Sequence, residues 1–242
     1  MSRISTAVEV IRSCGSNAPW YVRAARAPMR LVMWLALRAL MRIEIQGERV
    51  AEPAVIASNH PNVVDGLLVL MADAGMRPIA RWHRLALVRL GLWIGNSLIT
   101  TTGTPVTPHR GAYASALAHL RSGGRVWVAP EGGCQPERAL RTPRTGAVRL
   151  AHAASVPIHI LAVLHEVHPG PNVRRWPLGR RPRVVLRWGP CISATGDIPT
   201  DIDRLMTAMA DTAEMTWSGS ATATTSAPSS SVPAAPPERR VS

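Results

Sequence analysis

The 242-residue chain contains no lysine, no phenylalanine and only three cysteines, Cys14, Cys134 and Cys191. Three cysteines are too few for a disulfide-rich scaffold, and their positions lack the CxxC spacing of a zinc site. The first residues carry charges where a signal peptide needs an apolar segment. No uncharged apolar run reaches the roughly 18 residues of a membrane-spanning helix. These absences predict a protein of a reducing, cytoplasmic compartment without a transmembrane anchor.

Acidic residues are also scarce: 15 of them stand against 28 basic residues, all arginine, for a net charge of +13. Between Asp73 and Asp197 there are 17 arginines and only three acidic residues. So positive a field attracts a phosphorylated ligand or the surface of an anionic membrane. Nucleic acid is the less favoured partner, because no helix-turn-helix, RRM, KH or zinc-finger pattern occurs.

Hydrophobic residues make up 46% of the chain, enough for a folded core. Short apolar segments typical of strands alternate with segments of helical period, which predicts a three-layer α/β fold with a sheet flanked by helices. Ligands are then expected at the carboxyl ends of the strands. We expect strands at residues 42–46, 54–58, 98–101, 125–129, 157–164 and 183–188, and helices at residues 20–42, 62–74, 81–93, 111–121, 145–154 and 198–215.

The chain divides into an N-terminal helical segment (1–42), a main domain (43–217) and a tail (218–242). The tail is rich in Ser, Thr, Ala and Pro and almost devoid of large apolar residues, which predicts disorder. The helix at 20–42 is amphipathic, with Met, Val and Leu on one face and arginines on the other. It either packs on the domain with a solvated arginine face or lies in a membrane interface. The arginines concerned are Arg23, Arg26, Arg30, Arg38 and Arg42.

His60 and Asp65 stand five residues apart, directly after the apolar strand predicted at 54–58. At this spacing the carboxylate can reach one ring nitrogen of His60, which fixes the tautomer and leaves the other nitrogen free as a base. A His-x4-Asp spacing alone is weak evidence, since it also arises by chance. Asp65 could instead cap the helix that follows.

A second polar segment, Pro130-Glu131-Gly132-Gly133, follows the apolar strand predicted at 125–129. A glutamate at a strand end beside two glycines places a carboxylate next to exposed backbone amides, which suits a polar or phosphorylated ligand. The alternative is a surface turn whose glutamate pairs with an arginine.

Taken in order, these segments resemble the glycerolipid acyltransferase family typified by 1-acylglycerol-3-phosphate O-acyltransferase. The family's NHxxxxD block is complete from Asn59 to Asp65, and its Pro-Glu-Gly block is present at Pro130–Gly132. The block at Gly95–Thr101 has Thr101 where the family has arginine, and the third block has Cys134 where the family has its other arginine. A Val-Pro-Ile block at Val156 completes the likeness, which covers roughly residues 42–188.

The resemblance implies the family's mixed sheet and its chemistry. His60 would act as general base on an acceptor hydroxyl, Asp65 would hold its imidazole, and the hydroxyl oxygen would attack the thioester of acyl-CoA or acyl carrier protein. No cofactor and no metal are implied. Cys134 is a lesser alternative as nucleophile, because direct transfer needs no acyl-enzyme. Asn59 and Pro130 complete the motifs, and the acceptor-binding candidates are Glu131, Gly132, Arg110, Arg141 and Arg144.

The resemblance also predicts a lipid acceptor and a peripheral position on the cytoplasmic face of the cell membrane, at anionic lipids. Replacement of two arginines leaves two acceptors open: a lysophosphatidic-acid-like lipid held by neighbouring arginines, or a lipid without phosphate. A basic membrane-surface protein without catalysis is a further alternative. Among the other histidines, His165 and His168 flank Glu166 and could bind an ion, but a strand-to-loop transition is the favoured interpretation.

Overall fold

The computed structural model describes residues 20–49, 52–73, 75–81, 86–100, 108–134, 138–167 and 181–217. The first 19 residues and the predicted tail at 218–242 lie outside these ranges. The division of the chain into three parts therefore stays a prediction.

Strands of the described chain form one mixed sheet. They are β1 (Arg42–Gln46), β2 (Ala54–Ala57), β3 (Met76–Arg81), β4 (Leu98–Thr100), β5 (Arg125–Val128), β6 (Ile158–His165) and β7 (Arg183–Ile192). Their order is β1-β7-β6-β2-β5-β3-β4. The run from β6 to β4 is parallel throughout, whereas β7 is antiparallel to β6 and β1 is parallel to β7.

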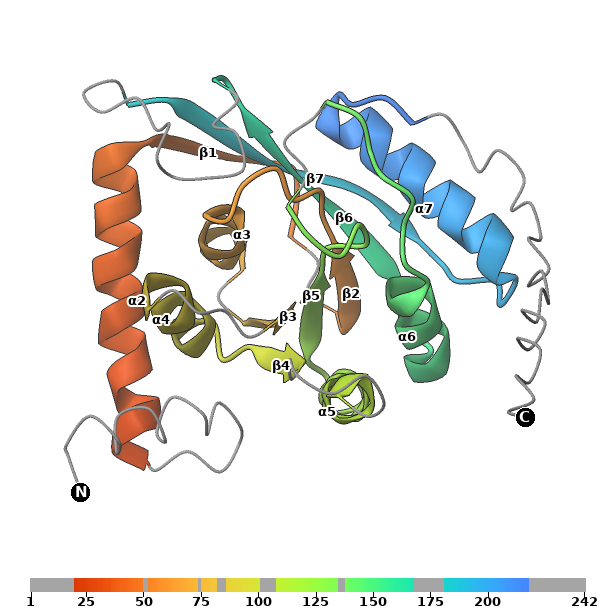
Figure 1. Ribbon diagram of the computed structural model, residues 1–242, viewed down its shortest axis with the longest axis horizontal. Helices are drawn as coiled ribbons and strands as arrows, with labels where there is room; N and C mark the ends of the chain where they lie inside the picture. Colours follow the sequence, from red (N-terminus) through yellow and green to blue (C-terminus); the bar gives the residue numbers. More distant parts are fainter. Residues whose placement is uncertain are drawn as a thin grey trace, which may run out of the picture.

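Helices cover both faces of this sheet, which confirms the predicted three-layer architecture. The helices are α2 (Trp20–Leu40), α3 (Asp65–Ala72), α4 (Ala86–Ile94), α5 (Pro108–Arg121), α6 (Gly146–Ala154) and α7 (Ile198–Ala213). Helices α2, α3 and α4 lie on one side of the sheet, and α5, α6 and α7 lie on the other (Figure 1).

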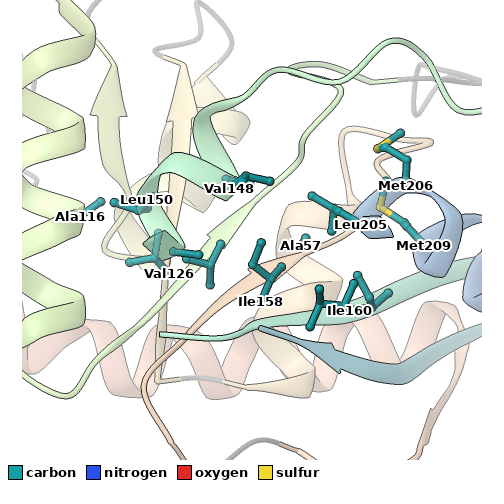
Figure 2. Close-up of a cluster of buried hydrophobic side chains, with 14 of the residues drawn as sticks. Ala57, Ala116, Val126, Val148, Leu150, Ile158, Ile160, Leu205, Met206 and Met209 are labelled. Atoms are coloured by element: carbon teal, nitrogen blue, oxygen red, sulfur yellow. The ribbon is translucent and has the colours of Figure 1, made fainter. Parts of the chain in front are cut away.

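β2 occupies the middle of the sheet and is buried on both faces. Successive side chains of a strand point to opposite faces. Val55 and Ala57 accordingly pack in the cluster with α5, α6 and α7, part of which Figure 2 shows, while Ala54 and Ile56 pack in the cluster with α2 and α3. A strand buried on both faces reads as a continuous apolar run, which is why the sequence predicts it well.

β3 is not among the strands predicted from the sequence, because Met76–Arg81 combines two arginines with a proline. Its first half pairs with β5 and its second half with β4. Pro78 stands where the pairing passes from one neighbour to the other, a place where a missing N–H does little harm. The helix expected at 81–93 correspondingly begins only at Ala86.

The arginines of α2 form a solvated face only in part, because Arg38 is exposed while Arg26 and Arg30 turn toward α4. Arg26 is only 8% exposed, and its guanidinium lies 5.8 Å from the centroid of the Trp93 ring in α4. Nε of Arg30 donates a hydrogen bond to the carbonyl of Ile94, the last residue of α4, at 2.9 Å. Several outward-facing positions of α2 are apolar: the exposed fractions are 58% for Leu31, 59% for Val32 and 53% for Leu35.

Within the described residues, the helices are too short or too polar for any of them to cross a bilayer.

Candidate active site

Three neighbouring parallel strands, β6, β2 and β5, end at the same edge of the sheet. His165 is the last residue of β6, His60 follows the end of β2, and Glu131 and Cys134 follow the end of β5. The carboxyl edge of the sheet therefore gathers imidazole, carboxyl and thiol groups from three separate parts of the chain, where an open α/β sheet places its ligands.

Asp65 joins two of these groups from the first turn of α3, where its side chain has no exposed surface. Its Oδ2 atom lies 3.4 Å from Nδ1 of His60, and its Oδ1 atom lies 2.7 Å from Nε2 of His165. The backbone amide of Asn62 also donates to Oδ2. Val64 is the N-cap of α3, and the Asp65 carboxylate turns toward the two imidazoles and the amide of Asn62, which precedes the helix.

Two opposing effects, burial and contacts with neighbouring side chains, set the pKa values of His60 and Asp65. Burial lowers the pKa of His60, but its contacts with Asp65 and Cys134 outweigh burial and raise the pKa to about 10. Burial raises the pKa of Asp65, and its contacts with His165 and His60 outweigh that effect, so the net direction is down. The pair therefore favours a carboxylate beside an imidazolium, and His60 becomes a base when it loses that proton.

Buried hydrogen bonds anchor the His60 loop to the neighbouring strands. The side-chain amide of Asn59 donates to the carbonyl of Val163 in β6 at 2.9 Å and accepts from the amide of Val163 at 2.8 Å. The hydroxyl of Ser58 accepts from the indole nitrogen of Trp127 in β5 at 2.6 Å. The Trp127 ring meets His60 edge-on, with centroids 5.7 Å apart. Asn59 is thus a positioning residue.

Glu131 turns toward the main chain of a neighbouring segment. Its Oε2 atom accepts a hydrogen bond from the backbone amide of Arg141 at 3.0 Å, so the expected glutamate–arginine pair is a main-chain contact. Its Oε1 atom is buried without a hydrogen-bond partner among the described residues. Burial raises the pKa of Glu131, against the opposing effects of the Arg141 amide and the charge of His60.

Two of the predicted acceptor-binding arginines border the same turn. The backbone amide of Arg144 donates to the carbonyl of Pro130 at 2.8 Å. A Cβ atom on Gly132 would lie 2.5 Å from Nε of Arg144, and Gly132 has a positive φ of 73°. The positive φ therefore favours glycine here, while the exposed Arg144 side chain lies directly over the turn. Arg141 and Arg144 are exposed, while Thr101 and the side chain of Arg110 lie outside the described part of the chain.

Two contacts of this site were not predicted from the sequence. Sγ of the half-buried Cys134 lies 3.3 Å from Nε2 of His60. His165 does end a strand, as expected, but its imidazole binds Asp65 instead of belonging only to a loop transition. The one feature of the sequence that could have indicated these contacts is that Cys134 and His165 each follow or end a predicted strand. No group of three or more metal-binding side chains occurs among the described residues, and His168 lies outside them.

An imidazole that lies 3.4 Å from a buried carboxylate and keeps 16% of its side chain exposed can take a proton from a hydroxyl or thiol nucleophile. Residues 42–164, just over half of the chain, match a family model described as Acyltransferase. The chain belongs to the acyltransferase family. The matched range of this acyltransferase includes the strands that carry His60, Glu131 and nearly all of β6.

A comparison of this acyltransferase with curated proteins finds no match. Among solved structures it is similar to the 1-acyl-sn-glycerophosphate (LPA) acyltransferase PlsC from Thermotoga maritima. The TM-score is 0.53 at 16% sequence identity, covering 77% of this chain and 78% of that one. At this identity the likeness concerns the fold, which confirms the α/β architecture that the sequence predicts.

Proposed function

We propose that this acyltransferase moves a fatty acyl chain from a thioester to the hydroxyl of a lysophosphatidic-acid-like glycerolipid. The observation that carries the proposal is the buried Asp65 carboxylate between His60 and His165, at the edge where three parallel strands end. A hydroxyl is a poor nucleophile at neutral pH, and a positioned base accelerates its attack by about 10²–10⁴-fold.

The proposed chemistry uses Nε2 of His60, the ring nitrogen opposite the one that faces Asp65. Neutral His60 takes the hydroxyl proton as the oxygen attacks a thioester carbonyl, and Asp65 stabilises the imidazolium that forms. The thiolate leaving group then receives the proton. The acyl donor is acyl-CoA or acyl carrier protein as co-substrate, with no cofactor in the scheme.

Arg144 and Arg141 support a phosphorylated acceptor, because both are exposed beside the turn at Pro130–Gly132. A guanidinium can bind phosphate through paired hydrogen bonds, each worth about 1.5–3 kcal/mol. Cys134 supports the other acceptor, since a cysteine side chain faces His60 where the resembling family has an arginine. A lipid acceptor without phosphate is therefore the second candidate.

Competition between lysophosphatidic acid and monoacylglycerol, with radiolabelled acyl-CoA as donor, separates these acceptors. The proposal expects preferential acylation of lysophosphatidic acid, and equal use of both lipids contradicts it. Arg144→Ala is expected to raise the KM for lysophosphatidic acid about 10–100-fold, the loss of one charge-assisted hydrogen bond, and to leave the KM for the donor unchanged. Arg149→Ala, an exposed arginine of α6 outside the turn, is the matched control.

α2 supports a peripheral position on a membrane surface, which we propose to be the cytoplasmic face. Leu31, Val32 and Leu35 are more than half exposed, and an exposed apolar helix face flanked by arginines suits a lipid surface. A groove of about 330 Å³ between α2 and α3 offers a place for an acyl chain. It is lined by Arg30, Leu31, Met33, Trp34, Leu70 and Met71.

Co-sedimentation with anionic vesicles tests this surface. Leu31→Ser combined with Leu35→Ser is expected to weaken binding about tenfold or more, because the apolar area of two leucines no longer enters the interface. Val167→Ser, at an exposed apolar residue outside α2, is the control. Unchanged vesicle binding by the double variant contradicts membrane docking through α2.

A further inference from the structure

Cys134, His60 and Asp65 form a series of thiol, imidazole and carboxylate. Sγ of Cys134 lies 3.3 Å from Nε2 of His60, and Nδ1 on the opposite side of the ring lies 3.4 Å from Oδ2 of Asp65. From this geometry we propose that Cys134 is the catalytic nucleophile that first accepts the acyl chain, so that transfer passes through an acyl-cysteine. The inference deepens the proposed function and rests on it.

The contact between the Cys134 thiol and Nε2 of His60 favours acylation of Cys134 before the acceptor hydroxyl reacts. Among the described residues Nδ1 is buried and faces Asp65, so Nε2 is the ring nitrogen available to a substrate. The thiol of Cys134 already occupies it. A direct attack by an acceptor hydroxyl would require Cys134 to move away first. In the two-step scheme the acylated sulfur has no proton to give, so Nε2 is released for the hydroxyl.

The local backbone holds Cys134 in this position. The turn after β5 places Gly132 at a positive φ of 73°, and its amide donates to the carbonyl of Ala129 at 3.0 Å. Apart from its chain neighbours, Gly133 has no described atom within 4 Å of a built Cβ, so this side of the turn before Cys134 is uncrowded. Cys134 itself is only partly buried. The thiol therefore keeps some exposed surface at which a thioester can reach Sγ, while His60 contacts the same sulfur as a base.

Both steps balance without an oxidant or a further reactant. In the first, His60 takes the S–H proton, Sγ attacks the carbonyl of the donor thioester, the donor C–S bond breaks, and the donor thiolate leaves with the proton. In the second, His60 takes the acceptor's O–H proton, the oxygen attacks the Cys134 thioester, and the C–S bond breaks to return the thiol. The two steps together amount to a thioester exchange followed by the formation of an ester.

Intact-protein mass spectrometry of the full chain, mixed with palmitoyl-CoA and no acceptor, tests the first step. The expected result is one palmitoyl adduct on Cys134 that hydroxylamine removes and lysophosphatidic acid chases. His60→Ala should slow its formation at least about 100-fold, the effect of removing a base from its nucleophile. Cys191, an exposed free thiol in β7, reports uncatalysed acylation within the same molecule.

Turnover of Cys134→Ala separates this inference from the proposed function. The two-step route predicts a loss of at least about 100-fold, with Cys191→Ala at the wild-type rate. Direct transfer predicts a Cys134→Ala enzyme as fast as wild type or faster, because the thiol no longer occupies Nε2. That result, or the absence of an adduct on wild-type Cys134, overturns the acyl-cysteine and leaves the proposed function standing. The proposed function itself fails if His60→Ala turns over at the wild-type rate.

Discussion

Asp65 and Asp73 stand at the two ends of α3, and neither carboxylate has any exposed surface. Asp65 lies at the carboxyl edge of the sheet between two imidazoles. Asp73 lies toward the opposite edge and pairs with Arg125 at the start of β5; its Oδ1 atom accepts from Nη2 of Arg125 at 3.1 Å. The two carboxylates share a helix and a degree of burial but differ in their partners.

The partner decides what a buried carboxylate can do. Guanidinium keeps its proton throughout the physiological range, so the Asp73–Arg125 pair is a fixed contact that joins α3 to β5. Imidazole exchanges its proton within a few pH units, so Asp65 can direct a proton transfer by holding His60. We therefore expect substitutions at Asp65 to affect turnover and substitutions at Asp73 to affect the free energy of unfolding.

Asp65→Asn should give the largest effect on activity. The amide keeps the size of the side chain but removes the charge that stabilises the His60 imidazolium, so kcat should fall about 10²–10⁴-fold. The unfolding transition should remain cooperative. Steady-state acyl transfer and thermal unfolding of the same preparation check both statements, and a kcat near the wild-type value contradicts the role given to Asp65.

Asp73→Ala should mainly reduce stability. Arg125, whose side chain is 15% exposed, would lose its carboxylate partner, and removing one member of a buried pair costs about 3–5 kcal/mol. For a chain of this length we expect the melting temperature to fall by roughly 10 °C. Differential scanning calorimetry measures this loss, while kcat at a temperature where the variant is folded should stay within about threefold of wild type.

The pH dependence of kcat should also distinguish Asp65 from Asp73. His60 has its pKa raised to about 10, so the neutral base, and with it kcat, should increase with rising pH over the neutral and mildly alkaline range. Asp65→Asn should move this rise to lower pH, whereas Asp73→Asn should leave it in place. The raised pKa of His60 adds stability that is fully present below its ordinary value near 6.5 and is lost as pH rises toward 10.

His165→Ala should lower kcat much less than Asp65→Asn does. His165 touches Asp65 and not the reacting nitrogen, so its loss should loosen the carboxylate and lower kcat by about 10-fold. His165→Gln, which can still donate to Oδ1, should recover part of the rate. If His165→Ala changed the KM for the acceptor and left both kcat and its pH profile alone, His165 would not act through Asp65.

At the carboxyl edge of the sheet, the sequence predicts the features that depend on residues close together in the chain. His60 and Asp65 are five positions apart and follow an apolar run. That spacing is weak evidence alone, and it becomes a prediction through the resemblance of Asn59–Asp65 to a complete NHxxxxD block. Glu131 follows a second apolar run in the same way. The three-layer fold is predictable for the same reason, since strands buried on both faces have an unmistakable composition.

Contacts between residues far apart in the chain could not be predicted, because no local sequence pattern indicates which distant residues meet. His165 reaches Asp65 across 100 positions, and Cys134 reaches His60 across 74. The inward direction of Arg26 and Arg30 depends on Trp93 and on the carbonyl of Ile94 in another helix. A single sequence shows the arginines but not the neighbours that bury them.

The central claim is that His60 removes the proton that starts acyl transfer. The direct measurement is the rate of acyl transfer from radiolabelled palmitoyl-CoA to lysophosphatidic acid by His60→Ala, compared with wild type at equal folded concentration near pH 8. The account predicts a loss of about 10²–10⁴-fold, the contribution of a positioned base. A rate for His60→Ala within a few-fold of wild type would contradict it.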